Sequence, residues 1–131
     1  SLSIEIFLIF MIIFVWTPPH FWALALYKSD DYKKANIPMM PLVVGYEKTV
    51  NMIIAYSFIL MPVVMSLSFY YSTFYSISIF ILSSIFIYLS LMLRISLNKP
   101  NFEDRAQSLF FFSIFYLFNI FSIILIDNLI W

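Results

Sequence analysis

Four long apolar segments, separated by short polar clusters, constrain this sequence of 131 residues more than any other feature. They cover residues 2–27, 49–70, 74–97 and 107–126, and each is long enough to cross about 30 Å of hydrocarbon as a helix. A membrane β-barrel requires alternating polar and apolar residues, whereas these segments are apolar on all sides. We therefore predict an all-α transmembrane fold with four membrane-spanning helices, the second kinked at Pro62.

The composition excludes several classes of function. Hydrophobic residues make up 63% of the sequence and charged residues 11%, unlike a soluble domain, which is roughly half apolar and a quarter charged. The absence of cysteine excludes disulfides, thiol catalysis and cysteine-based metal sites. A single glycine is too few for a glycine-rich loop that binds phosphate. Seven basic and seven acidic residues cancel, which argues against binding of nucleic acid.

The distribution of basic residues predicts the orientation in the membrane. Four spans place the loops at 28–48 and 98–106 on one side, and the turn at 71–73 on the other. Every basic residue falls on or next to the loops at 28–48 and 98–106. These residues are Lys28, Lys33, Lys34, Lys48, Arg94, Lys99 and Arg105. By the positive-inside rule this side is cytoplasmic, or faces the matrix if the membrane is mitochondrial.

The first apolar segment contains the strongest candidate site. Pro18 and Pro19 are expected to interrupt its helical hydrogen bonds, and His20, the one histidine of the chain, follows them directly. An ionisable side chain at this depth indicates a functional site by default. The alternative is a neutral histidine that is hydrogen-bonded to a carbonyl freed by the prolines.

Beyond this segment, an acidic pair and two lysines could bind phosphate. Asp30 and Asp31 could hold Mg²⁺ together with the phosphates that it bridges, and Lys33 and Lys34 could contact the same phosphates. The alternative is an ordinary solvated loop of mixed charge. Helical spacing places Trp16, His20, Tyr27 and Asp31 near one face if the helix stays regular.

Three further patterns concern the loop and the helix contacts. Residues 37–41 are expected either to fold back over the site as a lid or to lie on the headgroups as an interfacial helix. Ser76, Ser83 and Ser90 recur every seven residues, which favours a face for close helix packing. Asn119 is expected to donate a hydrogen bond to another helix, or else to face a ligand cavity.

The sequence starts at Ser1 rather than at Met, and no basic segment or small-residue cleavage site precedes the first apolar run. This start is not typical of a signal peptide, and we expect the sequence to be a fragment of a longer protein.

The strings W-T-P-P-H-F-W-A-L-A-L-Y at 16–27 and D-D-Y-K-K-A-N-I-P-M-M-P at 30–41 resemble the protohaem IX farnesyltransferases (haem O synthases). These enzymes belong to the UbiA-type intramembrane prenyltransferases. The resemblance continues through L-V-V-G at 42–45 and, less specifically, through 105–117. Asn36 stands where many members carry glycine, and the turn is expected to survive because asparagine tolerates a left-handed backbone.

The resemblance implies a bundle of nine transmembrane helices, with two Asp-bearing motifs facing each other on cytoplasmic loops over a central cavity. This chain corresponds to the second half, from about the sixth helix onward. Because the first Asp motif is absent from it, we expect the fragment alone to be inactive. The missing N-terminal half would then be a partner, together with the lipid bilayer.

The implied reaction is farnesyl transfer from farnesyl diphosphate to a vinyl group of haem b, for haem-copper oxidase cofactor biosynthesis. Mg²⁺ would be held through the diphosphate by the acidic pair, with Asp31 preferred over Asp30 as the catalytic residue. His20 would orient the haem or ligate its iron. The remaining substrate-binding candidates are Trp16, Tyr27, Lys33 and Lys34.

The implied location is the inner (plasma) membrane of a bacterium rather than that of a mitochondrion, and haem A synthase is a candidate partner. Two alternatives remain open: a UbiA-type enzyme that prenylates a quinone precursor, and a non-catalytic multi-pass membrane subunit. The first would lack the T-P-P-H-F-W string, and the second predicts that Asp31→Asn has no effect on any prenylation.

Overall fold

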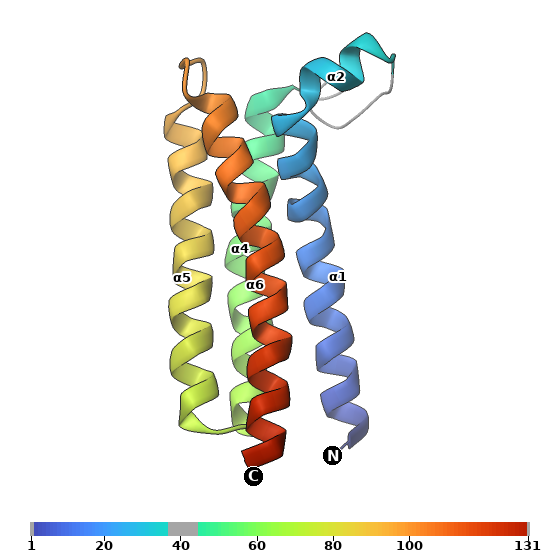
Figure 1. Cartoon of the computed structure of the whole chain (residues 1–131), viewed down its shortest axis with the longest axis vertical. Coiled ribbons are helices and arrows are strands. Elements are labelled where there is room, and N and C mark those ends of the chain that lie inside the picture. The colour runs from blue at the N-terminus through green and yellow to red at the C-terminus, as the bar shows by residue number, and fades with distance from the viewer. Residues whose placement is uncertain (1, 37–44, 131) are drawn as a thin grey trace.

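The computed structural model describes residues 2–36 and 45–130 (Figure 1). Within these ranges, the side chains of Leu2, Ser29, Asp30, Tyr32 and Ile130 are not described. Residues 37–41, for which the sequence predicts a lid or an interfacial helix, lie outside the described residues. The helices are α1 (Leu2–Tyr27), α2 (Ser29–Lys34), α4 (Tyr46–Ser66), α5 (Thr73–Ile95) and α6 (Phe102–Ile130), and a short 3₁₀ turn, η1 (Leu67–Phe69), extends α4.

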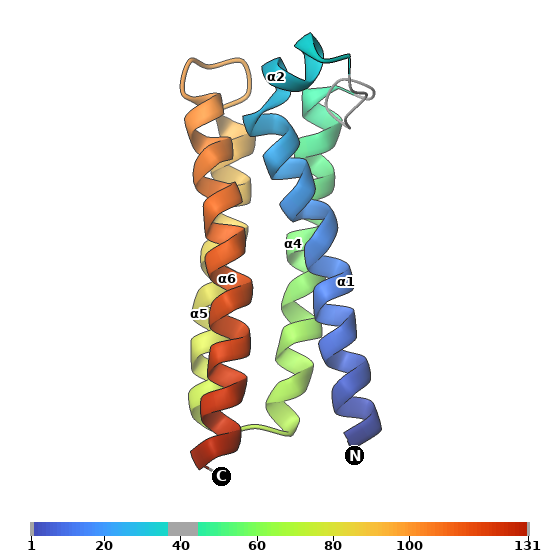
Figure 2. The same ribbon diagram turned by 45° about the vertical axis from the view of Figure 1, so that its right-hand side comes forward.

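The four long helices form an antiparallel bundle, in which each packs against two others. α1 and α5 each contact both α4 and α6. The α5–α6 connection and α2 lie at one end of the bundle, whereas the α4–α5 turn and both ends of the chain lie at the other (Figures 1 and 2). All four are long and apolar enough to cross a membrane. The predicted all-α transmembrane fold with four spans is therefore confirmed.

The helix bounds differ from the apolar segments mainly where polar residues continue a helix. α1 has the expected bounds, but α4 begins at Tyr46 rather than at residue 49. α6 runs from Phe102 to Ile130, beyond the predicted 107–126 at both ends. Its first turn contains Glu103 and Asp104, whose negative charges stabilise a helix N-terminus. Hydropathy therefore locates the span, while the helix itself is longer.

The prolines do not break the helices that contain them. α1 continues through Pro18 and Pro19, and α4 continues through Pro62. The predicted interruption is confined to the hydrogen bonds, because Pro18 and Pro19 have no backbone N–H to donate, and α1 remains one helix. Each proline removes only one backbone donor, and packing of α1 against α4 and α6 holds the remaining turns in place. Beside this stretch, the Thr17 hydroxyl donates to the Ile13 carbonyl at 2.6 Å.

Small and polar side chains lie at the contact between α5 and its neighbours. Of the three serines of the predicted packing face, Ser83 and Ser90 are buried as expected, whereas Ser76 is half-buried. The Ser83 and Tyr116 hydroxyls are 2.9 Å apart and join α5 to α6. Asn119 does not donate to another described helix as expected, because its amide donates to the Phe115 carbonyl of its own helix at 2.8 Å. The alternative, that it faces a ligand cavity, stays a prediction. Tyr116, one turn away, makes the interhelical bond instead.

Polar contacts also join the helices at both ends of the bundle. At the α2 end, Arg94 on α5 donates to the Asn51 side chain on α4 and lies 3.6 Å from the Glu47 carboxylate. At the opposite end, the buried carboxylate of Asp127 on α6 accepts hydrogen bonds from the Ser72 backbone N–H, at 3.1 Å, and from the Ser72 hydroxyl. The last turn of α6 is thereby attached to the turn between α4 and α5.

Candidate functional site

A polar cluster within the membrane-spanning region joins α1 to α6. The indole Nε1 of Trp16 donates to the Ser113 backbone carbonyl at 2.9 Å. The imidazole Nδ1 of His20 lies 2.6 Å from the Ser113 hydroxyl oxygen. Trp16 and His20 are one helical turn apart on α1, so both reach the same residue of α6. The structure thus brings two predicted site residues together around Ser113, which was not predicted and is completely buried.

Aromatic rings hold the imidazole of His20 in place. The Trp16 ring stacks on it with centroids 4.3 Å apart and an interplanar angle of 17°. The Phe110 ring of α6 also stacks on it, at 5.0 Å and 25°. Phe21 contacts the imidazole edge-on, at 5.4 Å. With these neighbours and a hydrogen bond at Nδ1, the ring has a defined orientation.

The hydrogen-bond partner of His20 is not a carbonyl freed by the prolines, which the sequence offered as one alternative. A carbonyl freed by Pro18 or Pro19 would belong to α1, whereas the observed partner is a hydroxyl on α6. The hypothesis of a bond to a freed carbonyl is therefore wrong. Sequence reasoning missed Ser113, because a serine among many in an apolar helix carries no distinguishing signal. Only the pairing of α1 with α6 selects it.

Tyr27 shares the face of His20, but Asp31 does not continue that face. The Tyr27 ring lies 6.3 Å from the Phe110 ring, which also stacks on His20. α1 then ends at Tyr27, and α2 turns away from the bundle axis (Figures 1 and 2). The expectation of one regular helix from His20 to Asp31 is therefore wrong, because Lys28 separates two helices.

The acidic segment forms a small exposed unit on α2. The Asp31 carboxylate is 70% exposed and lies 4.0 Å from the Lys28 ammonium, which is also 4.6 Å from the centre of the Tyr27 ring. Lys33 and Lys34 are exposed in the last turn. The side chain of Asp30 lies outside the part of the chain that is described.

Asn36 follows α2 with a left-handed φ of 58°, as its tolerance of this conformation predicts. The turn expected at this position is therefore present.

The side chains of α2 meet part of what a bound magnesium ion requires. Among the described residues no group of three or more His, Cys, Asp or Glu side chains could hold a metal by itself. Mg²⁺ bound with a diphosphate requires only one or two carboxylates from the protein, because phosphate oxygens and water complete its coordination. The exposed Asp31 carboxylate fits that requirement.

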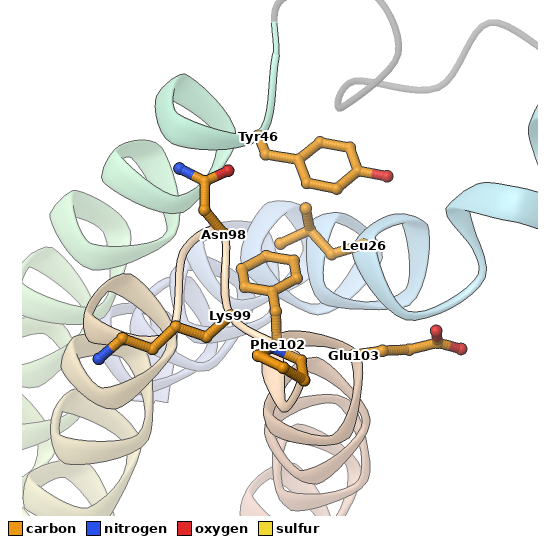
Figure 3. A pocket seen from close by; sticks show the side chains of 7 residues that line it. Leu26, Tyr46, Asn98, Lys99, Phe102 and Glu103 are labelled. Carbon is orange, nitrogen blue, oxygen red and sulfur yellow. The ribbon is translucent and has the colours of Figure 1, made fainter.

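Two cavities of the bundle lie apart from these residues. One, of about 290 Å³, opens beside the α5–α6 connection, where the Tyr46 and Phe102 rings stack at 5.6 Å. Figure 3 shows the Lys99 ammonium and the Glu103 carboxylate extending away from this ring pair on opposite sides. The other, of about 340 Å³, lies between α1 and α4 and is lined by Phe10, Ile13, Phe14, Thr17, Pro18 and Tyr56. None of the predicted site residues whose side chains are described lines either cavity.

The sequence profile of the UbiA prenyltransferase family matches residues 1–120. The chain belongs to this family. A protein from Pelagibacter ubique named protoheme IX farnesyltransferase is 44% identical over 99% of this chain and 44% of its own length. Its namesake from Bartonella bacilliformis is 43% identical over 100% of this chain and 43% of its own length.

A relative from Mesorhizobium japonicum, named protoheme IX farnesyltransferase 2, is 41% identical over 99% of this chain and 42% of its own length. The chain thus spans less than half the length of the curated relatives that it matches. No solved structure matches it.

Proposed function

We propose that this chain forms the C-terminal part of a protohaem IX farnesyltransferase, which transfers the farnesyl group of farnesyl diphosphate to a vinyl group of haem b. The supporting observation is that relatives with this name match nearly the whole chain, including the segment that carries Trp16, His20 and Asp31. The remainder of the enzyme would supply the first Asp motif, which this chain lacks, and complete the cavity.

The diphosphate would bind at the α2 end of the bundle. Asp31 would hold Mg²⁺ there together with the diphosphate and, as we infer from the sequence, with Asp30. When bound, the ion neutralises charge on the leaving diphosphate. Lys33 and Lys34 add positive charge on the same exposed helix, and donors placed where charge develops lower the barrier to ionisation.

The chemistry requires a dry cavity that places the farnesyl carbon against the vinyl group. The allylic C–O bond breaks, the electron pair leaves with the diphosphate, and farnesyl C1 forms a bond to the terminal vinyl carbon. Water then adds to the resulting cation and loses a proton, which gives the hydroxyethylfarnesyl product. On this chain, the half-buried rings of Trp16 and Tyr27 lie between the membrane interior and α2, and aromatic side chains there would suit a flat porphyrin and a prenyl chain.

Haem O formation by the native full-length gene product, in a bacterial strain that lacks its own enzyme, tests the proposal. We expect haem O in pigment extracts analysed by mass spectrometry. Asp31→Asn should abolish it, while the protein still inserts into the membrane. Asp104→Asn is the matched control, because it neutralises another exposed carboxylate at the same end of the bundle and should retain activity.

The other outcomes identify the alternatives. Wild-type haem O levels with Asp31→Asn would refute the assignment of the diphosphate site. A prenylated quinone precursor in the extract, in place of haem O, would identify a different UbiA-type substrate. No prenylated product from a correctly inserted wild-type protein would refute the enzymatic proposal and favour a non-catalytic membrane subunit.

His20 is proposed to act on the haem substrate rather than on the prenyl donor. In the purified full-length protein, His20→Ala should therefore weaken haem binding more than binding of farnesyl diphosphate. Titration of each ligand, followed by haem absorbance and by calorimetry, measures the two affinities. The reverse order of effects would refute this role.

We also propose a bacterial plasma membrane as the location, with the α2 end in the cytoplasm, since the basic residues gather at that end. The intact mass of the native polypeptide in source membranes tests for the remainder of the enzyme. A mass about twice the 15.5 kDa of this chain would support it. Co-purification with haem A synthase would test that enzyme as a partner.

A further inference from the structure

We propose that Ser113 is a positioning residue that fixes the tautomer of His20, so that the Nε2 lone pair faces the iron of the porphyrin substrate. The inference rests on the function proposed above, in which haem b is that substrate. It assigns a role to a residue of α6 that contacts no substrate itself and acts through α1.

The hydrogen bonds of Ser113 determine which imidazole nitrogen carries the proton. A serine hydroxyl has one proton to donate. The Ser113 hydroxyl lies 2.6 Å from the Phe110 carbonyl of its own helix and donates to it. If that proton pointed at Nδ1 instead, the hydroxyl and carbonyl oxygens would meet at 2.6 Å with no proton between them. The consistent arrangement is therefore Nδ1–H of His20 donating to Ser113, which leaves Nε2 unprotonated.

The described surroundings do not enclose Nε2 completely. In the described part of the chain, no buried side-chain nitrogen or oxygen lacks a hydrogen-bond partner, and the bond of His20 is made at Nδ1. Nε2 is therefore not completely enclosed by the described residues. Stacking by Trp16 and Phe110 prevents the ring from turning, and the Trp16 bond to the Ser113 carbonyl fixes α1 against α6 at this level.

A neutral imidazole with Nδ1–H bonded to a protein acceptor is the arrangement that metal-ligating histidines adopt. Here the acceptor is an uncharged hydroxyl rather than a carboxylate, so it orients the ring without strongly raising the basicity of Nε2. A ligand of moderate strength suits an iron porphyrin that must leave after each turnover. The predicted ligand atom is thus Nε2 of His20, and its geometry depends on Ser113.

The test compares ferric haem with metal-free protoporphyrin IX on the purified full-length protein. Loss of an outer partner typically weakens metal binding by about 10- to 100-fold. We expect Ser113→Ala to weaken haem binding at least about 10-fold and to leave binding of the metal-free porphyrin unchanged. Ser113→Thr, which retains a hydroxyl, should restore most of the haem affinity.

Ser90→Ala is the matched control, since Ser90 is equally buried and donates to the Phe86 carbonyl of its own helix at 2.9 Å. It should change neither affinity. If Ser113→Ala weakens both porphyrins equally, or neither, the positioning role is refuted. Electron paramagnetic resonance of haem-bound wild type gives a second criterion that requires no Ser113 variant. A spectrum that His20→Gln leaves unchanged would also refute the proposal.

These outcomes separate the inference from the function on which it rests. A wild-type protein that forms haem O, but whose haem affinity ignores Ser113→Ala, overturns the positioning role alone. A wild-type protein that forms no haem O, yet shows a haem spectrum dependent on both His20 and Ser113, overturns the proposed reaction and supports the ligand geometry.

Discussion

Replacement of Asp127 should destabilise the bundle more than replacement of any exposed acidic residue. Its side chain is 3% exposed, and it accepts two hydrogen bonds from Ser72, one from the backbone N–H and one from the hydroxyl. Asp127→Ala removes both acceptors. The Ser72 hydroxyl also accepts a hydrogen bond from the Tyr75 backbone N–H at 3.5 Å, so the first turn of α5 depends on the same contact.

The expected magnitude follows from the two donors that lose their acceptor. A donor left without a partner in a buried site costs about 1–3 kcal/mol. Ser72 is half-buried and recovers part of that loss from water. We therefore expect Asp127→Ala to lower the free energy of unfolding by about 2 kcal/mol, which is roughly a 30-fold change in the unfolding equilibrium. Asp127→Asn, which retains one acceptor oxygen, should cost about 1 kcal/mol.

Reversible unfolding of the full-length protein in mixed detergent micelles, followed by tryptophan fluorescence, measures these differences. Asp104→Ala is the control, because Asp104 is an exposed residue in the first turn of the same helix. Its loss removes only a favourable interaction with the helix dipole, worth at most about 1 kcal/mol. If Asp127→Ala and Asp104→Ala are equally stable, the Asp127–Ser72 contact does not stabilise the bundle and the reasoning is wrong.

Two further predictions concern tyrosines. A double-mutant cycle of Ser83→Ala and Tyr116→Phe should give a coupling energy near 0.6 kcal/mol, the average for hydrogen bonds between membrane helices; zero coupling would contradict the α5–α6 bond. Burial and the nearby Glu5 carboxylate raise the pKa of Tyr71 above its usual value of 10.0. The contribution of Tyr71 to stability is therefore fully present below about pH 10 and falls as the pH rises further, because Tyr71 ionises at a lower pH in the unfolded chain than in the folded protein. Ultraviolet titration should show one late-ionising tyrosine fewer in Tyr71→Phe than in wild type, and a Tyr71 that ionised at or below its usual pKa would refute this.

The site could be predicted from the sequence only where residues close along the chain form it. Trp16 and His20 are one turn apart, so helical periodicity alone places them together, and the observed ring stacking confirms it. Asp31 illustrates the limit of the same argument. The periodicity assumes a continuous helix, and the end of α1 at Tyr27 turns Asp31 away from the face of His20.

The sequence also does not predict which polar residue of an apolar helix faces another helix. Asn119 and Ser113 are both isolated polar residues on α6, and the sequence singles out the amide because it is costlier to bury. In the structure the amide satisfies itself on its own helix, while the serine bonds to His20 on α1. Which polar residue faces another helix depends on the rotation of α6 about its own axis, and apolar residues on all sides of a helix do not define that rotation.

The sequence by itself determined the number of spans and the end of the bundle at which the basic residues gather. Both follow from segment length and charge, which are local properties of the chain. Only the tertiary structure decided that α1 packs between α4 and α6, that Ser113 is the partner of His20, and that Asp127 attaches α6 to the α4–α5 turn. His20 and Ser113 are 93 positions apart in the sequence, and Ser72 and Asp127 are 55 positions apart. The packing of uniformly apolar helix surfaces brings each pair together, and no local sequence pattern predicts it.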